Sequence, residues 1–237
     1  MKSPPPVEPA PDQTTPSPGE QVKVWDLPVR LFHWLLVGLL ALSWYTGETG
    51  GLDEMTWHMW SGSAVLALVL FRIGWGVVGS TTARFGHFVH GPSEAARDAA
   101  SLLRRRPPAH VGHPPLGGWM VVLMLACLLV QAGTGLFAND DIFTEGPLTG
   151  WVSKETSDWL TTIHKWNFEL LLVLAGVHLA AVMYYVLVLR TNLVKAMFTG
   201  RKQLPAGEPQ TPLRFVHPAV AVALAAAAAG GVWLLVA

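Results

Sequence analysis

Two histidines interrupt one long apolar stretch, residues 159–190, at a spacing that places them on one face of a helix. His164 and His178 lie 14 residues apart, which is close to four turns at about 3.6 residues per turn. At about 1.5 Å per residue, the two positions lie roughly 21 Å apart along the axis. A membrane hydrocarbon core is about 30 Å thick, so one imidazole would lie towards each surface. Such a helix could hold one flat cofactor near each side of a membrane.

The elements that must position these histidines are five apolar runs, each near the roughly 20 residues that a membrane span requires. The chain is 51% hydrophobic and 14% charged, whereas soluble domains carry about 25% charged residues. This composition argues against an ordinary soluble domain. We therefore predict an all-α, polytopic membrane protein with a four-helix transmembrane bundle and a fifth transmembrane helix. The runs cover about 29–46, 57–79, 116–138, 159–190 and 215–237.

The segments outside these runs suggest the domain organisation. Residues 1–21 are rich in Pro, Ser and Thr, which predicts a disordered tail. We assign residues 22–200 to the bundle domain, with a basic surface loop at 80–115, and residues 201–237 to a linker and the fifth helix. Within the loop, the segment from Ser93 to Arg106 predicts an amphipathic helix on the membrane surface, which Pro107 and Pro108 would end. No internal repeat is convincing.

The charges predict an orientation. Lysine and arginine gather in the N-terminal segment, in 80–115 and in 190–214, whereas the other loops contain only Lys154 and Lys165. The positive-inside rule then places the N-terminus in the cytoplasm and the C-terminus outside. The outer loops hold Glu48, Asp53, Glu54, Asp140, Asp141, Glu145, Glu155 and Asp158. These carboxylates could steer a basic soluble partner or simply keep the loops soluble.

With this orientation, four histidines sort into two levels. His33 and His178 lie near the inner surface, and His58 and His164 lie near the outer surface. Two imidazoles can occupy both axial positions of a haem iron. We therefore predict two non-covalent, bis-histidine haems, one for each pair. The single cysteine, Cys127, excludes a C-x-x-C-H haem attachment site and an iron–sulfur set.

The histidine pairs could also bind a bare metal ion, and Arg72 has more than one possible role. Zinc or copper fits less well, because each level offers two histidines and no cysteine or carboxylate set. Arg72 lies 14 residues after His58 and shares its helix face at the inner level. It could bind haem propionates or extend to the cytoplasmic surface. The remaining histidines are expected at the surface: His87, His90, His110, His113 and His217.

Four sequence strings resemble the bacterial cytochrome b561 family, which includes the cytochrome b subunits of nickel-iron hydrogenases. They are Val-Trp-Asp-Leu-Pro-Val-Arg-Leu-Phe-His-Trp (24–34), Phe-Arg-Ile-Gly-Trp-Gly-Val-Val-Gly-Ser (71–80), Gly-His-Pro-Pro-Leu-Gly-Gly-Trp (112–119) and Thr-Gly-Leu-Phe-Ala-Asn-Asp-Asp (134–141). The likeness covers about residues 22–200. In that family, histidines on helices one, two and four hold two b haems, which implies His33, His58, His164 and His178 here.

What the resemblance implies is a di-haem carrier that exchanges electrons with the quinone pool or with a partner redox protein. Quinone oxidoreductase activity stays open, because no quinone-site motif can be matched. The expected partners are membrane lipid, quinone, and a c-type cytochrome or other redox protein at the acidic outer face. We also consider a homodimer, and we expect no nucleic acid. Two alternatives remain: a haem-bearing anchor subunit of a larger dehydrogenase or hydrogenase complex, and a histidine-relay transporter, which would be colourless.

Overall fold

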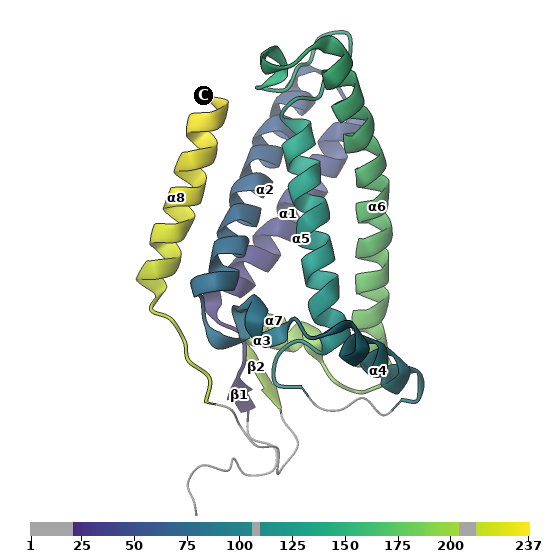
Figure 1. Ribbon diagram of the computed structural model, residues 1–237, viewed down its shortest axis with the longest axis vertical. Helices are drawn as coiled ribbons and strands as arrows, with labels where there is room; N and C mark the ends of the chain where they lie inside the picture. Colours follow the sequence, from purple (N-terminus) through teal and green to yellow (C-terminus); the bar gives the residue numbers. More distant parts are fainter. Residues whose placement is uncertain (1–20, 106–109, 204–211) are drawn as a thin grey trace, which may run out of the picture.

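The computed structural model describes residues 21–105, 110–203 and 212–237. Four long helices form a bundle, and a fifth, α8, packs against α2 on the outside (Figure 1). All five are long and apolar enough to cross a membrane, so the predicted all-helical fold with five spans is confirmed. Their bounds are α1 Leu27–Thr49, α2 Leu52–Val78, α5 Pro115–Gly135, α6 Lys154–Leu187 and α8 Pro218–Val236.

Local sequence explains where the helices begin and turn. Asp26 caps α1, because its side chain accepts a hydrogen bond from the Val29 amide at 2.9 Å, and Pro28 suits the first turn. Gly50 and Gly51 have φ angles of 66° and 101°, which residues with a side chain rarely adopt. These two glycines let the chain reverse between α1 and α2 with almost no loop. The α6 helix, capped by Ser153, continues for 34 residues.

The short elements gather at the end of the bundle where the described chain begins (Figure 1). Strand β1 (Gln21–Lys23) pairs antiparallel with β2 (Arg201–Gln203), so Gln21 of the expected tail and the start of the expected linker form a small ribbon. The elements α3 (Phe85–Phe88), α4 (Pro92–Leu103) and α7 (Leu193–Thr199) lie at the same end. The α1–α2 turn, the α5–α6 connection with η2 (Thr149–Trp151), and the C-terminus lie at the opposite end. The rest of the expected tail and the expected helix stop at Arg106–Pro108 fall outside the described residues.

Helix α4 corresponds to the predicted amphipathic segment, but one face of it is docked onto the bundle. Asp98 is 4% exposed, and its carboxylate accepts a hydrogen bond from the Leu116 amide at the start of α5 at 3.2 Å. On the other side, the Tyr184 hydroxyl donates to the Leu102 carbonyl at 2.8 Å. The helix therefore joins α5 to α6 at this end of the bundle, which charge pattern alone did not indicate.

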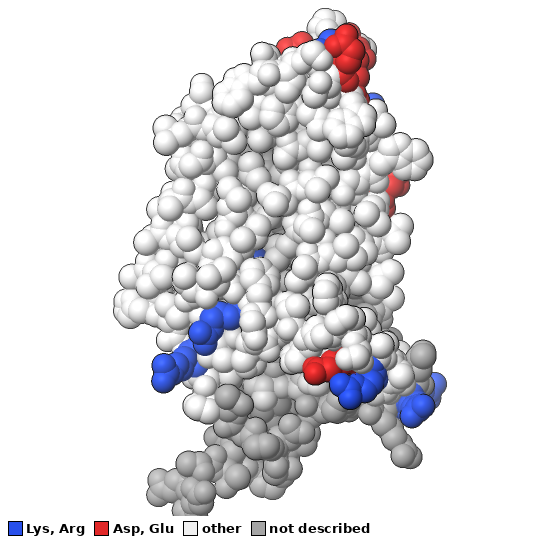
Figure 2. Space-filling view, viewed as in Figure 1, with Lys and Arg blue, Asp and Glu red and all other residues white. Residues whose placement is uncertain are grey.

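Charged side chains separate between the two ends of the molecule. In Figure 2, carboxylates gather mainly at the end that carries the α5–α6 connection, whereas lysines and arginines gather mainly at the end that carries α4. Between the ends, the surface in this view is almost uncharged. This is the pattern expected for a bundle whose middle faces lipid.

A buried hydrogen bond joins α1 to α2 near the end of the bundle that carries β1 and β2. The Trp75 indole, which is fully buried, donates to the Asp26 carboxylate at 2.9 Å. Asp26 thus accepts hydrogen bonds both from a free backbone amide at the start of α1 and from an indole N–H group in the protein interior. Because Asp26 is itself 5% exposed, water cannot easily replace it.

We expect Asp26→Ala to lower the free energy of unfolding by about 2–4 kcal/mol, since it removes a helix cap and leaves a buried indole N–H unpaired. The matched control is Asp53→Ala, an exposed carboxylate in the first turn of α2, which should cost less than about 1 kcal/mol. Chemical unfolding of the purified protein in detergent measures both. Equal effects from the two variants would contradict the role given to Asp26.

Candidate functional site

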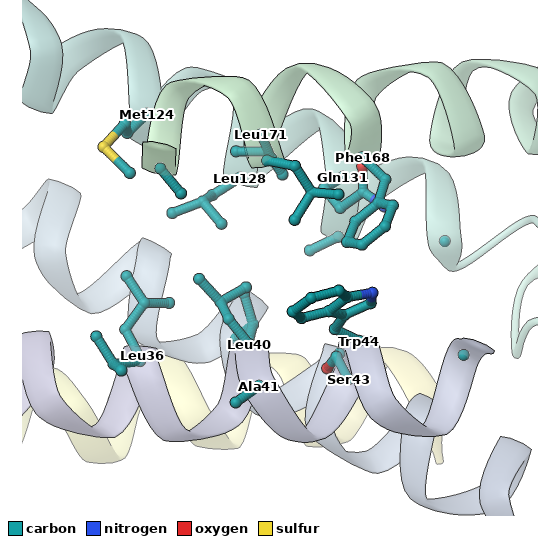
Figure 3. A pocket seen from close by; sticks show the side chains of 18 of the residues that line it. Leu36, Leu40, Ala41, Ser43, Trp44, Met124, Leu128, Gln131, Phe168 and Leu171 are labelled. Atoms are coloured by element: carbon teal, nitrogen blue, oxygen red, sulfur yellow. The ribbon is translucent and has the colours of Figure 1, made fainter. Parts of the chain in front are cut away.

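A large cavity runs between α1, α2, α5 and α6. It has a volume of about 1960 Å³, and its lining is mostly apolar. Figure 3 shows side chains from α1 and from α5 and α6 facing one another across it, with the Trp44 indole opposite the Phe168 ring. All four histidines predicted as ligands, His33, His58, His164 and His178, are among the residues that line it. A space of this size and character suits large, flat, apolar ligands.

His58 on α2 and His164 on α6 face each other at the end of the cavity near the α1–α2 turn. Their ring centroids are 6.2 Å apart, and the ring planes are inclined by 77°. Two imidazoles on opposite sides of one metal ion should have centroids about 6 Å apart, given metal–nitrogen bonds of about 2 Å and about 1 Å from each nitrogen to its ring centre. The spacing of this outer pair therefore fits a single metal ion between the rings.

Hydrogen bonds fix the proton on each ring of the outer pair. His58 Nδ1 lies 2.8 Å from the Ser43 carbonyl oxygen, and His164 Nδ1 lies 2.9 Å from the Gln131 carbonyl oxygen. A carbonyl oxygen can only accept, so Nδ1 carries the proton in both residues and Nε2 keeps its lone pair. The Gln131 side-chain amide nitrogen lies 3.1 Å from His164 Nε2, which agrees with this tautomer. Both rings are thus prepared to bind a metal through Nε2.

His33 on α1 and His178 on α6 line the cavity towards its other end. The two imidazoles are close enough to interact electrostatically. The Nδ1 atom of His33 is buried, and it has no hydrogen-bond partner among the described residues. This inner pair therefore brings two imidazoles to the second level but differs from the outer pair in how His33 is held.

His113 is not the ordinary surface residue that we expected. It lines the large cavity beside the inner pair and also a small cavity of about 220 Å³ that His87, His90 and His110 share. Its ring packs against Trp25 and Phe88, with centroids 4.5 and 4.9 Å away. His217, in contrast, is exposed. The sequence does contain an indication of this burial, because His113 directly precedes an apolar run. Its place in a polar, proline-rich connection nevertheless favours a surface position.

The surroundings of His113 keep its ring neutral. Burial, followed by the nearby Arg72, His178 and Lys202, lowers the pKa of His113 to about 3. Its Nδ1 atom is enclosed and has no hydrogen-bond partner within the described parts of the chain. A neutral ring with a free nitrogen at the inner end of the cavity can donate or accept one hydrogen bond from a ligand there.

Arg72 lies at the inner level but points away from the surface. It is 2% exposed, which rules out the alternative in which it extends to the cytoplasmic headgroups. Its guanidinium packs over Phe85 and Phe88, at 5.3 and 5.8 Å from the ring centroids, and Asp26 is near enough to attract it. Its Nη1 atom has no partner among the described residues. Arg72 is not one of the residues lining the large cavity, so it can act on a ligand there only at its edge.

The paired histidines cannot complete a metal site by themselves. Among the described residues, no group of three or more histidine, cysteine, aspartate or glutamate side chains could hold a metal ion. A haem iron needs only two axial ligands because the porphyrin supplies four nitrogens. The two histidine pairs, the apolar cavity and the Nε2 lone pairs of His58 and His164 therefore fit haem better than a bare metal ion.

Comparisons with known proteins agree with this chemistry. The family described as "Prokaryotic cytochrome b561" matches residues 24–200. One relative is the "Probable Ni/Fe-hydrogenase B-type cytochrome subunit" of Rhizobium leguminosarum bv. viciae, which is 27% identical over 217 residues, covering 77% of this chain and 89% of the relative. No solved structure matches significantly. Because the family match spans the whole four-helix bundle, the chain belongs to the prokaryotic cytochrome b561 family and is a membrane b-type cytochrome.

Proposed function

We propose that this cytochrome carries electrons between the two faces of a membrane through two b haems, one held by His58 and His164 and the other by His33 and His178. The observation that supports this most strongly is the outer pair, whose rings are 6.2 Å apart with both Nδ1 atoms bonded to helix carbonyls. Haem supplies a one-electron redox centre. The protein holds, orients and shields it.

Helix α6 sets the distance between the two levels in this proposal. His164 and His178 lie on one helix, 14 residues apart, so the ligand positions differ in depth by roughly 21 Å. Both pairs line the same cavity. Flat cofactors extending from the two levels into this space would have edges closer than their ligands, which favours direct electron transfer between them.

The inner end offers groups suited to the haem propionates. Arg72 and His113 each have a buried nitrogen without a partner among the described residues, and Lys202 lies near enough to His113 to affect it. Guanidinium and carboxylate form strong, charge-assisted hydrogen bonds. We therefore assign Arg72 and His113 to the propionate side of the inner haem.

The partners we propose are quinone and a redox protein. The relative's printed name makes it a hydrogenase subunit, and by analogy this chain could serve as the electron-transfer subunit of a redox complex.

The charge separation in Figure 2 supports an orientation with the basic end in the cytoplasm and the acidic end in the periplasm. At the acidic end, backbone N–H groups of residues 142–144 lower the pKa of Asp140 to about 2, so its charge persists at any physiological pH. That end suits a basic c-type cytochrome or a similar partner.

The first prediction from this assignment concerns haem content. We expect the wild-type protein to contain two haems per chain and His58→Ala and His164→Ala to contain one each, because a haem with one axial ligand is poorly held. His33→Ala and His178→Ala should each lose the other haem. The exposed His217→Ala is the matched control and should keep both. A pyridine haemochrome assay of the purified protein, combined with a reduced-minus-oxidised spectrum, measures this; two haems in His58→Ala would refute the pairing.

A second prediction separates the inner site from the outer one. Because its pKa of about 3 keeps His113 neutral at pH 7, His113→Phe preserves charge and packing but removes Nδ1. We expect it to shift the midpoint potential of one haem only, the same haem that His33→Ala loses. His217→Phe serves as the control. Potentiometric titration checks the result, and a shift in the other haem would show that His113 does not serve the inner site.

A third prediction tests the acidic end. We expect the reduced protein to transfer electrons to a basic c-type cytochrome at a rate that falls as ionic strength rises, since salt screens steering. The double variant Asp53→Asn, Glu54→Gln should react more slowly at low salt and show a weaker salt dependence. Glu94→Gln, on α4 at the opposite end, should react like the wild type. Stopped-flow kinetics measure these rates; identical salt dependence in all three proteins would mean that this face does not steer a basic partner.

A further inference from the structure

Three residues of α1 surround the ring of His58. The Ser43 carbonyl accepts the Nδ1 hydrogen bond at 2.8 Å. Thr46 donates its hydroxyl to the Leu42 carbonyl at 2.8 Å and to the same Ser43 carbonyl at 3.2 Å. A Cβ atom added at Gly47 would lie 3.0 Å from both Cε1 and Nδ1 of the ring. The ring therefore lies against the helix at a position where any side chain would crowd it.

Helix α5 repeats this arrangement around His164. The Gln131 carbonyl accepts from Nδ1 at 2.9 Å. Thr134 donates to the Val130 carbonyl at 2.7 Å and to the Gln131 carbonyl at 3.2 Å. A Cβ atom added at Gly135 would lie 3.0 Å from Cε1 and 3.3 Å from Nδ1. The acceptor, the threonine and the glycine have the same relative positions, i, i+3 and i+4, as in α1.

The correspondence extends to a side-chain pair behind each ring. The Ser43 and Ser61 hydroxyls are 2.6 Å apart, and the Asn167 side-chain amide donates to the Gln131 side-chain carbonyl at 2.7 Å. Ser61 and Asn167 each follow their histidine by three residues. We call the two sets the histidine cradles: Ser43, Thr46, Gly47 and Ser61 for His58, and Gln131, Thr134, Gly135 and Asn167 for His164.

We propose that the two cradles are matched positioning devices, which set the tautomer, the ring plane and the electron donation of both axial ligands of the outer haem. This inference rests on the proposed function. In each cradle, the glycine restricts the position of the ring, and the threonine adjusts the strength of the hydrogen bond from Nδ1. Because the threonine hydroxyl shares the acceptor carbonyl, it weakens the bond from Nδ1–H and so limits how basic the imidazole becomes.

The cradles belong to the outer pair. In the described chain, His33 Nδ1 has no hydrogen-bond partner, so at least one ligand of the inner pair lacks the device. The two cradles also differ from each other in two respects. Thr134 Oγ1 lies 3.4 Å from His164 Nδ1, a contact that the structure does not give for Thr46 and His58. The Gln131 amide reaches His164 Nε2 at 3.1 Å, and a metal on that nitrogen would displace it and leave Gln131 held by Asn167 beside the ring.

The glycines provide the first test, with a matched control on each helix. Gly47→Ala and Gly135→Ala are compared with Gly38→Ala on α1 and Gly133→Ala on α5, where an added Cβ would meet no atom within 4 Å. Low-temperature electron paramagnetic resonance of the oxidised protein reports the relative orientation of two axial imidazoles for each low-spin haem. We expect both cradle variants to shift or abolish the same one of the two signals and both controls to retain the wild-type spectrum. Spectra like the controls, or shifts in different signals, would overturn the proposal.

The threonines provide a second test that does not depend on crowding. Thr46→Val and Thr134→Val remove the hydroxyl while keeping the shape, so the threonine no longer competes with the histidine for the carbonyl and the imidazole donates more strongly. We expect each variant to lower the midpoint potential of the outer haem, the double variant to lower it further, and Thr46→Ser and Thr134→Ser to restore the wild-type value. An unchanged or raised potential in the valine variants would refute the assigned role.

The proposed haem ligation and the proposed role of the cradles can be refuted separately. If His58→Ala and His164→Ala do not each lose one haem, the proposed ligation is wrong. If they do, but the glycine and threonine variants behave like their controls, the ligation stands and only the cradles are refuted.

Discussion

The hydrogen bond from a histidine Nδ1–H to a helix carbonyl is the interaction on which the outer site depends. In a membrane interior, a backbone carbonyl is already committed to its own helix, and few other acceptors exist. Ser43 and Gln131 offer the second lone pair of such carbonyls to His58 and His164. A ring held this way has a fixed tautomer and a lone pair directed into the cavity. Each helix hairpin, α1–α2 and α5–α6, thereby supplies one half of the site.

This constraint explains why small residues appear at particular places in long apolar helices. An imidazole reaches a helix carbonyl most easily where the next turn of that helix lacks a side chain, and an added Cβ at Gly47 or Gly135 would crowd the ring. Other glycines serve packing instead: a Cβ at Gly74 would collide with Leu224 of α8, and one at Gly76 with the Phe85 ring. The glycines thus lie at two kinds of close contact in the same bundle: an imidazole ring against a helix, and an apolar side chain against a helix.

Much of the architecture could be predicted from sequence, because membrane thickness and helical rise together fix the depth of a residue. The five spans follow from this, and so does the expectation that His58 and His164 meet at one level, where the structure places their ring centroids 6.2 Å apart. The place of His113 could not be predicted in the same way, because it depends on how a proline-rich loop packs onto Trp25 and Phe88. The cradles also escaped notice. Their shared sequence is only a Thr-Gly pair, 46–47 and 134–135, and the correspondence appears only in the contacts around the rings.

Under the proposed assignment, the two haem sites would differ electrostatically. Arg72 and Lys202 lie near His113, at the proposed propionate side of the inner haem, and a cation beside a haem stabilises the reduced form, which carries one more electron. Near the outer pair, the carbonyl bonds strengthen the axial donors, which stabilises the oxidised form. The carboxylates of the surrounding loops act in the same direction, whereas Lys165, which is near enough to act on His164, opposes them. Apart from Lys165, these effects make the inner site the better electron acceptor. With these effects the outer haem would have the lower potential, so an electron on it would move downhill either to the inner haem or to an acceptor of higher potential bound at the acidic end, and the charge distribution would favour the outer haem as the donor in both reactions.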